Sequence, residues 1–572
     1  MKFRDYPYTR PDMDALERLT DDCVAKIRSA QSAAEQIEQM EAYNKVRMNF
    51  NTQSTLISIR YSQDTTNEQI NAEREFMDVA DAKMTDLLNR FYRAVTESKF
   101  RPELEKHFSP YYFEVLDGQL KTFHPDILPD IEEENRLTSQ YIKLRSSAKI
   151  PFDGEERSIS EMGKYYESKD RAVRKAAQEA VTRFYEEHES EFDDIYDQLV
   201  KVRDRMAKTL GFENFVPLGY LRMQRIGYTP SDVAVYRNEV LKHVVPAVAE
   251  FEKAQAKRLG LESLKYYDDP LMFLDGNADP QGPPEWILEH GKQMYHELSP
   301  ETREFIDFMI EHELLDLVAR KGKAGGGYCT FLPDYHAPFI FSNFNGTSGD
   351  VDVLTHEAGH AFYCFLNRYQ QIPEFIWTTY EAAEIHSMSM EFLTYPWMER
   401  FFEQYTDKYK YNHIVGAVSF LPYGVLVDEF QHAVYENPAM TPAERKATWA
   451  KLHAKYLPGT DYEDNAFLKK GGYWFRQGHI FEMPFYYIDY TLAQVCAFQF
   501  FVKSRADRKQ AWEDYLRLCR AGGSKPFLEL VDLAGLESPF REGMLESIIP
   551  PMVDYLKHLS ITESAPDQAT KS

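Results

Sequence analysis

Cysteine is scarce in this sequence, which has only five in 572 residues. They are scattered, odd in number and without CxxC spacing: Cys23, Cys329, Cys364, Cys496 and Cys519. This pattern argues against a disulfide framework and a thiolate zinc site, and it favours free thiols in a reducing compartment. The longest apolar stretch, from Ile414 to Val427, is too short to span a bilayer and is interrupted by glycine and proline.

Basic residues are also fewer than acidic ones. The chain has 66 Lys and Arg against 91 Asp and Glu, which gives a formal net charge of -25. A surface this acidic repels phosphate backbones, so we expect no nucleic-acid partner. The segment from Met1 to Pro7 has no apolar core of the kind found in secretory signals. We therefore expect a cytoplasmic protein that does not associate with membranes, and the sequence leaves its oligomeric state open.

The N-terminal part is predicted to be helical. Between Met13 and Arg101 the chain has neither glycine nor proline, and its apolar residues recur at helical spacing, which indicates long antiparallel helices. Alternation over residues 141–159 about the turn at Asp153 and Gly154 predicts a β-hairpin. Helical spacing returns over 161–210. We take residues 1–200 as an N-terminal helical region.

The rest of the chain is expected to be a catalytic region over residues 201–560, followed by a disordered tail over 561–572. Turn residues are frequent over 260–284, which predicts loops. Residues 325–331 and 338–344 read as two short strands directly before a helix. The fold class is therefore mainly α, with a small β-sheet beside that helix.

This helix carries an HExxH motif, formed by His356, Glu357 and His360. Two histidines four residues apart project from one helix face and can bind one metal ion through their imidazoles. Glu357 lies about 100° around the helix from His356, where it can reach a metal-activated water without ligating the ion. The motif predicts a zinc site in which Glu357 acts as a general base.

A catalytic zinc site needs a third protein ligand, and the helical segment over 378–391 offers several. Glu381, Glu384 and Glu391 share roughly one face of this segment. Glu384 is favoured on this basis, and the other two remain alternatives. Glu391 is also suited to orient a ligating histidine, and Asp352 is a weaker candidate for the same role.

Taken together, these motifs resemble the thimet oligopeptidase and oligoendopeptidase F group of zinc metallopeptidases, most of all the oligoendopeptidase F branch. The resemblance lies in the HExxH segment and in the Glu-x-x-Ser-x-x-x-Glu pattern from Glu384 to Glu391. It extends over about residues 160–545 and includes these further segments: 323–329, 343–347, His479, 485–490 and 522–527.

The resemblance implies an elongated, helical zincin-type body with a deep substrate channel and one Zn²⁺ at its floor. It also implies that Glu384 is the third zinc ligand and that short oligopeptides are the substrates. His479 and one or more of the tyrosines after it are expected to contact the substrate carbonyl. The spacing departs by about one residue from the thimet enzymes, so the choice between Tyr490 and Tyr487 stays open.

We therefore expect a zinc-dependent endopeptidase that hydrolyses internal bonds of oligopeptides. A metallocarboxypeptidase would use the same core but would need a cationic pocket for the substrate carboxylate. A non-catalytic peptide-binding protein would not need Glu357, which is intact. Cys329 and Cys364, although near the motif in sequence, are interpreted as inert buried thiols. The strand over 339–344 either offers an edge on which an extended peptide can pair or belongs to a plain buried hairpin.

Overall fold

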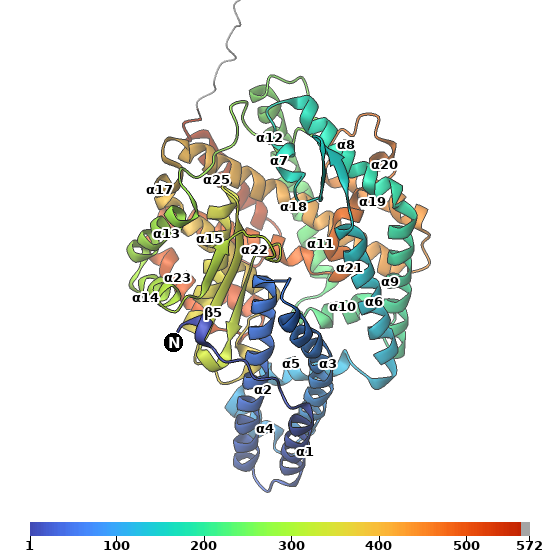
Figure 1. The fold of residues 1–572 in the computed structure, drawn as a ribbon, viewed down its shortest axis with the longest axis vertical. Coiled ribbons are helices and arrows are strands. Elements are labelled where there is room, and N and C mark those ends of the chain that lie inside the picture. Colours follow the sequence, from blue (N-terminus) through green and yellow to red (C-terminus); the bar gives the residue numbers. More distant parts are fainter. Residues whose placement is uncertain (562–572) are drawn as a thin grey trace, which may run out of the picture.

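The computed structural model describes residues 1–561, which are mainly helical as expected, so most of the predicted tail lies outside the described residues. Three long helices that pack on one another confirm the N-terminal prediction. The side chains of Asp12, Ser32 and Asn67 cap their first turns by accepting backbone N–H groups. With two shorter helices they form the lobe at the bottom of Figure 1: α1 (Met13–Ser29), α2 (Ala33–Gln63), α3 (Glu68–Thr96), α4 (Arg101–Phe108) and α5 (Pro110–Lys121).

The predicted hairpin is present but shorter than expected. β1 (Ile150–Phe152) and β2 (Glu155–Arg157) pair in antiparallel fashion around Asp153 and Gly154. The residues before them are helical and belong to α6 (Leu128–Ser146). Its Leu137 and Tyr141 are buried in the core, and a helix buries both on one face. Helices follow as predicted: α7 (Gly163–Tyr166), α8 (Arg171–Glu187) and α9 (Glu189–Thr209). Because α9 continues through residue 200, the predicted boundary there falls within a helix.

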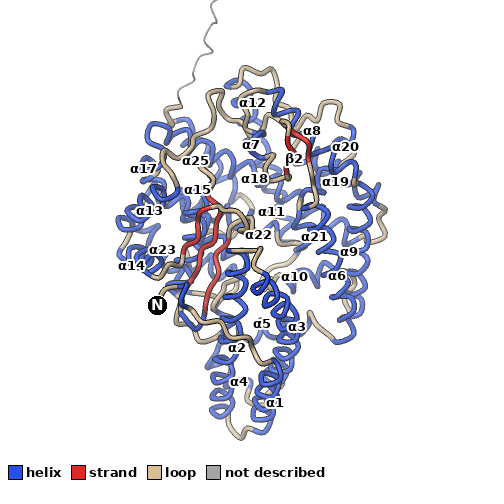
Figure 2. The backbone as a smooth tube through the Cα atoms, viewed as in Figure 1, coloured by secondary structure: helices blue, strands red, loops and turns tan. Residues whose placement is uncertain are grey.

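A three-stranded sheet lies beside the motif helix (Figure 2). The two predicted strands are β4 (Tyr328–Leu332) and β5 (Ala337–Phe344), which pair in antiparallel fashion. A third strand that the sequence reasoning missed, β3 (Leu315–Val318), pairs in parallel with the other side of β5. β5 is therefore the central strand, and the alternative in which it offers a free edge was wrong. The free edge nearest the motif helix belongs to β4.

Behind the sheet, the motif helix α15 (Gly349–Leu366) packs against α16 (Tyr380–Leu393), which in turn packs against α22 (Tyr487–Ala506). Large apolar side chains of all three helices belong to one core cluster. Further helices surround this centre: α10 (Phe215–Arg222), α11 (Pro230–Glu239), α12 (Val245–Arg258), α13 (Pro284–Leu298), α14 (Pro300–Glu311), α17 (Glu399–Phe402), α19 (Pro442–Tyr456), α20 (Ala466–Lys469), α21 (Gly478–Glu482), α23 (Arg508–Ala521), α24 (Phe527–Leu533) and α25 (Met544–Lys557).

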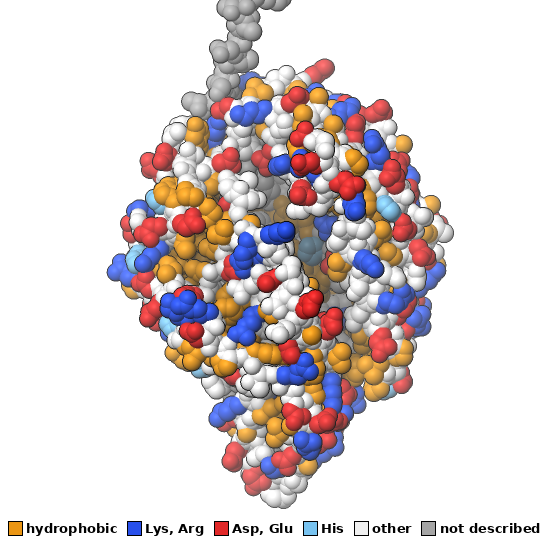
Figure 3. Space-filling view, in the orientation of Figure 1, with side chains coloured by type: hydrophobic (Ala, Val, Ile, Leu, Met, Phe, Trp, Pro, Cys, Tyr) orange, Lys and Arg blue, Asp and Glu red, His pale blue; other side chains and the backbone are white. Residues whose placement is uncertain are grey.

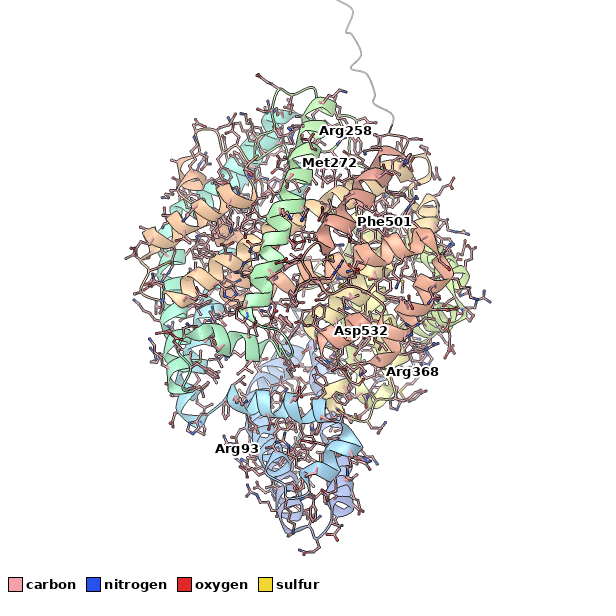
Figure 4. The ribbon with its side chains drawn as sticks, turned by 180° about the vertical axis from the view of Figure 1, so that it is seen from behind. Arg93, Arg258, Met272, Arg368, Phe501 and Asp532 are labelled. Atoms are coloured by element: carbon pink, nitrogen blue, oxygen red, sulfur yellow. The ribbon has the colours of Figure 1, made fainter. Side chains whose placement is uncertain are left out.

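The segment Glu399–Glu436 is long and apolar enough by composition to cross a bilayer, and 61% of its apolar window is buried inside the protein. Most of it is α18 (Thr406–Glu436), which packs against α12, α19 and α22, so its apolar residues serve the core. The predicted loops over 260–284 lie beside α12 on the rear face. There the Arg258 guanidinium donates to the carbonyl of Met272, 3.2 Å away (Figure 4).

The molecule is elongated along the vertical axis of Figure 1, as the resemblance implied. In the space-filling view, the front face is hollowed between the side that carries the sheet and the side that carries α6 and α9 (Figure 3). A histidine is visible at the floor of this hollow. The N-terminal lobe joins the rest of the molecule beside the sheet, where α2 contacts β4. The fold thus places a hollow in front of the helices that carry the predicted site.

Candidate active site

The two helices that carry the predicted metal ligands touch at one glycine. A Cβ atom placed on Gly359 of α15 would lie 2.5 Å from the carbonyl oxygen of His386 and 2.6 Å from the Cα of Ser387, both on α16. Real Cβ atoms do not approach backbone this closely, so glycine is required for the contact. The glycine between the two motif histidines thus brings the imidazoles up to the next helix.

The structure brings His356, His360 and Glu384 together, with one potential ligand atom from each within 4.8 Å of the others. The Glu384 Oε2 atom lies 3.3 Å from His356 Nε2 and 3.6 Å from His360 Nε2. A tetrahedral zinc ion with bonds of about 2.0–2.2 Å sets neighbouring ligand atoms about 3.3–3.6 Å apart. These three side chains therefore have the identity and the spacing that a zinc ion requires.

Two of the three proposed ligands, His356 and Glu384, each form a hydrogen bond with another side chain. His356 donates through Nδ1 to Glu391, 2.6 Å away, which leaves its Nε2 facing Glu384. The other oxygen of Glu391 accepts from His413 at 2.8 Å. The free carboxylate oxygen of Glu384, Oε1, accepts from the Tyr486 hydroxyl at 3.0 Å. Such contacts fix the orientation of a ligand and the tautomer of an imidazole.

The other acidic candidates have different partners. The buried carboxylate of Glu381 accepts from the Tyr228 hydroxyl and is not in the three-residue cluster. Asp352 accepts from Tyr409 at 2.6 Å, and no histidine among residues 1–561 donates to it. The structure thus separates both side chains from the imidazole pair. Glu391 contacts that pair only at His356 Nδ1, which is the arrangement expected of an orienting residue.

Glu357 lies on the same helix beside the ligands and is only 8% exposed. Burial raises its pKa, against the lowering effect of the neighbouring His356 and His360. A carboxylate with a raised pKa is a better proton acceptor from water than an ordinary one. The nearby Cys329 and Cys364 are free thiols, and burial raises the pKa of Cys329 well above its ordinary value. Cys364 is buried, as interpreted from sequence, whereas Cys329 is only partly buried, and its raised pKa makes it a poor nucleophile.

His479 on α21 lies against the tyrosines at the start of α22. Its ring centroid is 5.0 Å from that of Tyr487 and 5.8 Å from that of Tyr490. The charges of Glu384 and Glu357 contribute to the pKa of Tyr490, which burial and these charges raise to about 12. The pKa of Tyr487 is raised by burial and by other tyrosines. Tyr490 packs on Tyr486, whose hydroxyl reaches Glu384. Tyr487 instead packs on Phe420 and Tyr423 of α18, so Tyr490 is the one on the side of the proposed metal ligands.

Two residues of this cluster were missed by sequence reasoning. Tyr486 was assigned no role from the sequence, yet its hydroxyl reaches Glu384. It precedes Tyr490 by four residues, so helical spacing places the two rings on one face, 4.8 Å apart. Gln477 lies 2.8 Å from His479 Nδ1 through its side-chain nitrogen and accepts from Tyr423 through its oxygen. No motif in the sequence singles out Gln477.

Comparison with known proteins agrees with this geometry. The sequence model described as Peptidase family M3 matches residues 164–549, and that of the Peptidase M3 N-terminal domain matches residues 3–123. Group B oligopeptidase PepB of Streptococcus agalactiae is 25% identical over 530 residues, which cover 84% of this chain and 82% of that protein. An oligoendopeptidase F homolog of Borreliella burgdorferi is 22% identical over 71% of each chain.

A solved structure is more similar still. PZ peptidase A, determined with an inhibitor, is 51% identical and superimposes with a TM-score of 0.93 over 99% of this chain and 100% of its own. The family match covers most of the chain, and the helical architecture is shared along its whole described length. This chain belongs to peptidase family M3 and is a metallo-endopeptidase.

Proposed function

We propose that the protein is a zinc-dependent oligoendopeptidase that hydrolyses internal peptide bonds of short oligopeptides. The observation that carries this proposal is the cluster of His356, His360 and Glu384, with one potential ligand atom from each within 4.8 Å of the others. Two imidazoles and one carboxylate with a further position open are the ligand set of a catalytic zinc site. Cobalt and manganese are compatible with the same ligands, and the affinity order favours zinc over both.

When bound, the ion supplies Lewis acidity, which acidifies water and polarises the carbonyl group of a peptide bond. Glu357 takes the proton of the attacking water through its carboxylate and later passes it to the leaving amine. Its burial next to the ligands keeps the carboxylate out of bulk water. Glu391 holds His356 in the tautomer whose Nε2 is free and would bind the ion.

His479 and Tyr490 donate to the oxyanion that forms on the attacked carbonyl. The Nδ1 atom of His479 faces the amide nitrogen of Gln477, so that Nε2 carries the ring proton and can donate. Tyr490 supplies a hydroxyl from the side of the ligands, and its high pKa keeps that hydroxyl protonated. Tyr487, which contacts the ring of His479, is the second candidate for this role.

The free edge of β4 is proposed to pair with the main chain of the substrate. Unpaired N–H and C=O groups along a strand edge bind extended peptides in many complexes. A cavity of about 470 Å³ adjoins this strand and is bounded by α2 on its other side. Its polar lining includes hydroxyl groups from both elements: Ser54, Ser58, Tyr328 and Thr330.

A hydrolysis assay with a fluorogenic oligopeptide, with and without a chelator, tests the proposal. Activity should be lost on chelation and return with added zinc, in parallel with the metal content of the protein. Activity that persists in metal-free protein would overturn it. Product mapping by mass spectrometry separates internal cleavage from removal of single C-terminal residues. The five free cysteines fit the proposal that the enzyme acts in the cytoplasm.

A further inference from the structure

Phe485 has a strained backbone at the point where the chain enters α22. It lies between α21 and α22, directly before Tyr486, and its φ angle is 70°. Left-handed backbone is uncommon for residues other than glycine, and for a bulky aromatic residue it is a genuine strain. Such strain persists only where the surroundings over-determine the conformation, and it is concentrated at functional sites. The contacts of Phe485 therefore show what fixes the start of α22.

Both backbone groups of Phe485 are bonded to side chains from distant parts of the sequence. Its N–H donates to the side-chain oxygen of Gln431 on α18, 2.9 Å away. Its carbonyl accepts from Arg225, which lies between α10 and α11. The same guanidinium nitrogen donates at 2.7 Å to Asp489 in the first turn of α22. All of these groups are buried, so water does not compete for the bonds that hold this segment.

The ring of Phe485 is held as closely as its backbone. A Cβ atom placed on Gly219 of α10 would lie 2.6 Å from a carbon of this ring, so the ring touches the helix itself. The ring centroid also lies 5.0 Å from that of His432 and 5.6 Å from that of Tyr435, both on α18. Since α18 packs against both α10 and α22, the ring is fixed between well-anchored helices.

The residues that follow Phe485 carry two hydroxyl groups of the candidate site. Tyr486 donates to Glu384 at 3.0 Å, and the ring of Tyr490 lies 4.8 Å from that of Tyr486. A rotation of the backbone at Phe485 changes the direction in which α22 begins, and it therefore moves both hydroxyls. A shift of about 1 Å in a group that acts on the reacting atoms can cost about 100-fold in rate.

We propose that Gln431 and Arg225 are positioning residues for the peptidase reaction. They hold Phe485 in its left-handed conformation and so set the direction in which α22 begins. The Tyr490 hydroxyl is thereby aimed at the attacked carbonyl. Neither positioning residue forms a hydrogen bond to a proposed metal ligand among residues 1–561. This inference rests on the proposed function, because it is that function that gives Tyr490 an oxyanion to stabilise.

Gln431→Met tests the role without disturbing a buried charge, because Arg225 and Asp489 stay in contact. The variant keeps the length of the side chain and removes the acceptor of the Phe485 N–H. The unpaired N–H then favours a rotation of the strained backbone. At saturating zinc, kcat should fall about 10- to 100-fold. KM should change little, because the oxyanion exists only after the attack on the carbonyl. Steady-state kinetics with a fluorogenic oligopeptide measure both.

Gln499→Met is the matched control. Gln499 is also a buried glutamine that accepts one backbone N–H and donates to one backbone carbonyl, in this case those of Glu537 at 2.7 and 2.9 Å. It lies twelve residues after Tyr487 on α22, about 18 Å along the helix. Both variants should lose similar amounts of unfolding free energy, because each leaves the same kinds of backbone group unpaired. Only Gln431→Met should lose kcat.

A double-mutant cycle tests whether Gln431 acts through Tyr490. Once the Tyr490 hydroxyl is absent, a wrong position of this residue costs little. Gln431→Met should therefore lower kcat of the Tyr490→Phe enzyme by no more than about twofold, which is the usual error of additivity. A merely structural role of Gln431 predicts instead that the two losses multiply.

Gly219→Ala approaches Phe485 from the side of its ring and does not alter Gln431. The added methyl group overlaps the ring and should displace it, so kcat should fall here as well. Gly416→Ala is the matched control, because it makes the same change within a helix with nothing inside 4 Å of the new atom. It should keep the wild-type kcat.

Three results would overturn the positioning role: wild-type kcat in folded Gln431→Met, equal losses of kcat in the two glutamine variants, or losses that multiply with that of Tyr490→Phe. If Gln431→Met does not fold, wild-type kcat in Gly219→Ala overturns the role in its place. Wild-type protein that is loaded with zinc and cleaves no oligopeptide would overturn the proposed function itself. That result is distinct, because it is seen without any variant.

Discussion

Glu357 is not one of the proposed ligands, and among the described residues its side chain forms no hydrogen bond to them or to α16, so its removal can be separated from metal binding. Glu357→Gln should keep stoichiometric zinc and the wild-type melting temperature. The loss of proton transfer should lower kcat by about 10²–10⁴-fold. Metal analysis and steady-state kinetics on the same preparation test this. Turnover near the wild-type rate in the zinc-loaded variant would exclude a general-base role.

The two glutamates one helical turn apart on α16 should differ in metal affinity. Glu384→Ala removes one of three ligands and should lose zinc readily in a graded chelator series. Glu381→Ala should keep zinc, because that carboxylate accepts from Tyr228 and does not face the imidazoles. The buried Tyr228 hydroxyl loses its partner, so some loss of stability is expected. Zinc loss in Glu381→Ala alone would move the ligand by one turn.

The three tyrosines at the start of α22 should have different effects. Tyr490→Phe should lower kcat by about 10²–10³-fold with little change in KM or zinc content, because its hydroxyl acts on the oxyanion. Tyr486→Phe should instead weaken zinc binding by about 10- to 100-fold, since its hydroxyl orients Glu384. Parallel kinetics and zinc titrations, with Tyr487→Phe included, assign each role. A loss of kcat only at Tyr487 would transfer the oxyanion role to it.

At the scale of elements, the spacing of α15 and α16 depends on Gly359. Gly359→Ala should force the helices apart and cost about 1–3 kcal/mol of unfolding free energy, with weaker zinc binding as a result. Gly416→Ala in α18 is the control, because nothing lies within 4 Å of its added Cβ atom. It should be neutral or stabilising by up to about 1 kcal/mol. Chemical denaturation of both variants checks the difference, and equal stability of the two would contradict the close contact.

The sequence predicted elements well where local pattern decides them. The long N-terminal helices, the loops over 260–284 and the two strands before α15 follow from glycine, proline and apolar spacing. The third strand, β3, could not be predicted, because four residues carry little pattern and its pairing with β5 is long-range. That omission left β5 with an unpaired side and misplaced the free edge. Tyr141 was misassigned because a buried helix face and a strand can share short apolar patterns.

The candidate site also contains residues that local sequence pattern predicts and residues that only the structure identifies. Helical spacing brings His356, Glu357 and His360 to one region, and two facing helices were enough to suggest Glu384. Selecting it over Glu381 required the family resemblance, and the contacts of Gln477 required the structure. These depend on Tyr423 of α18, which no spacing within one segment can place beside Gln477.

For the whole molecule, the position of the site at the floor of a hollow limits what can be cleaved. The N-terminal lobe is fixed against the catalytic region by buried contacts, such as that of Tyr92 with Glu374 at 2.7 Å. Unstructured peptides should therefore be cleaved, and stable folded proteins should be spared. Incubation with a folded protein and with its denatured, alkylated form compares the two. Rapid digestion of the folded form by pure enzyme would contradict the restricted access.

The three proposed ligands come from two helices that meet at Gly359, and the unfolded chain has no equivalent arrangement. Zinc should consequently act as a thermodynamic ligand of the native state alone. Each tenfold rise in free zinc above the dissociation constant then adds about 1.4 kcal/mol to the free energy of unfolding. The melting temperature becomes a gauge of metal occupancy, and a cell that withholds zinc would lower the amount of folded enzyme as well as its activity.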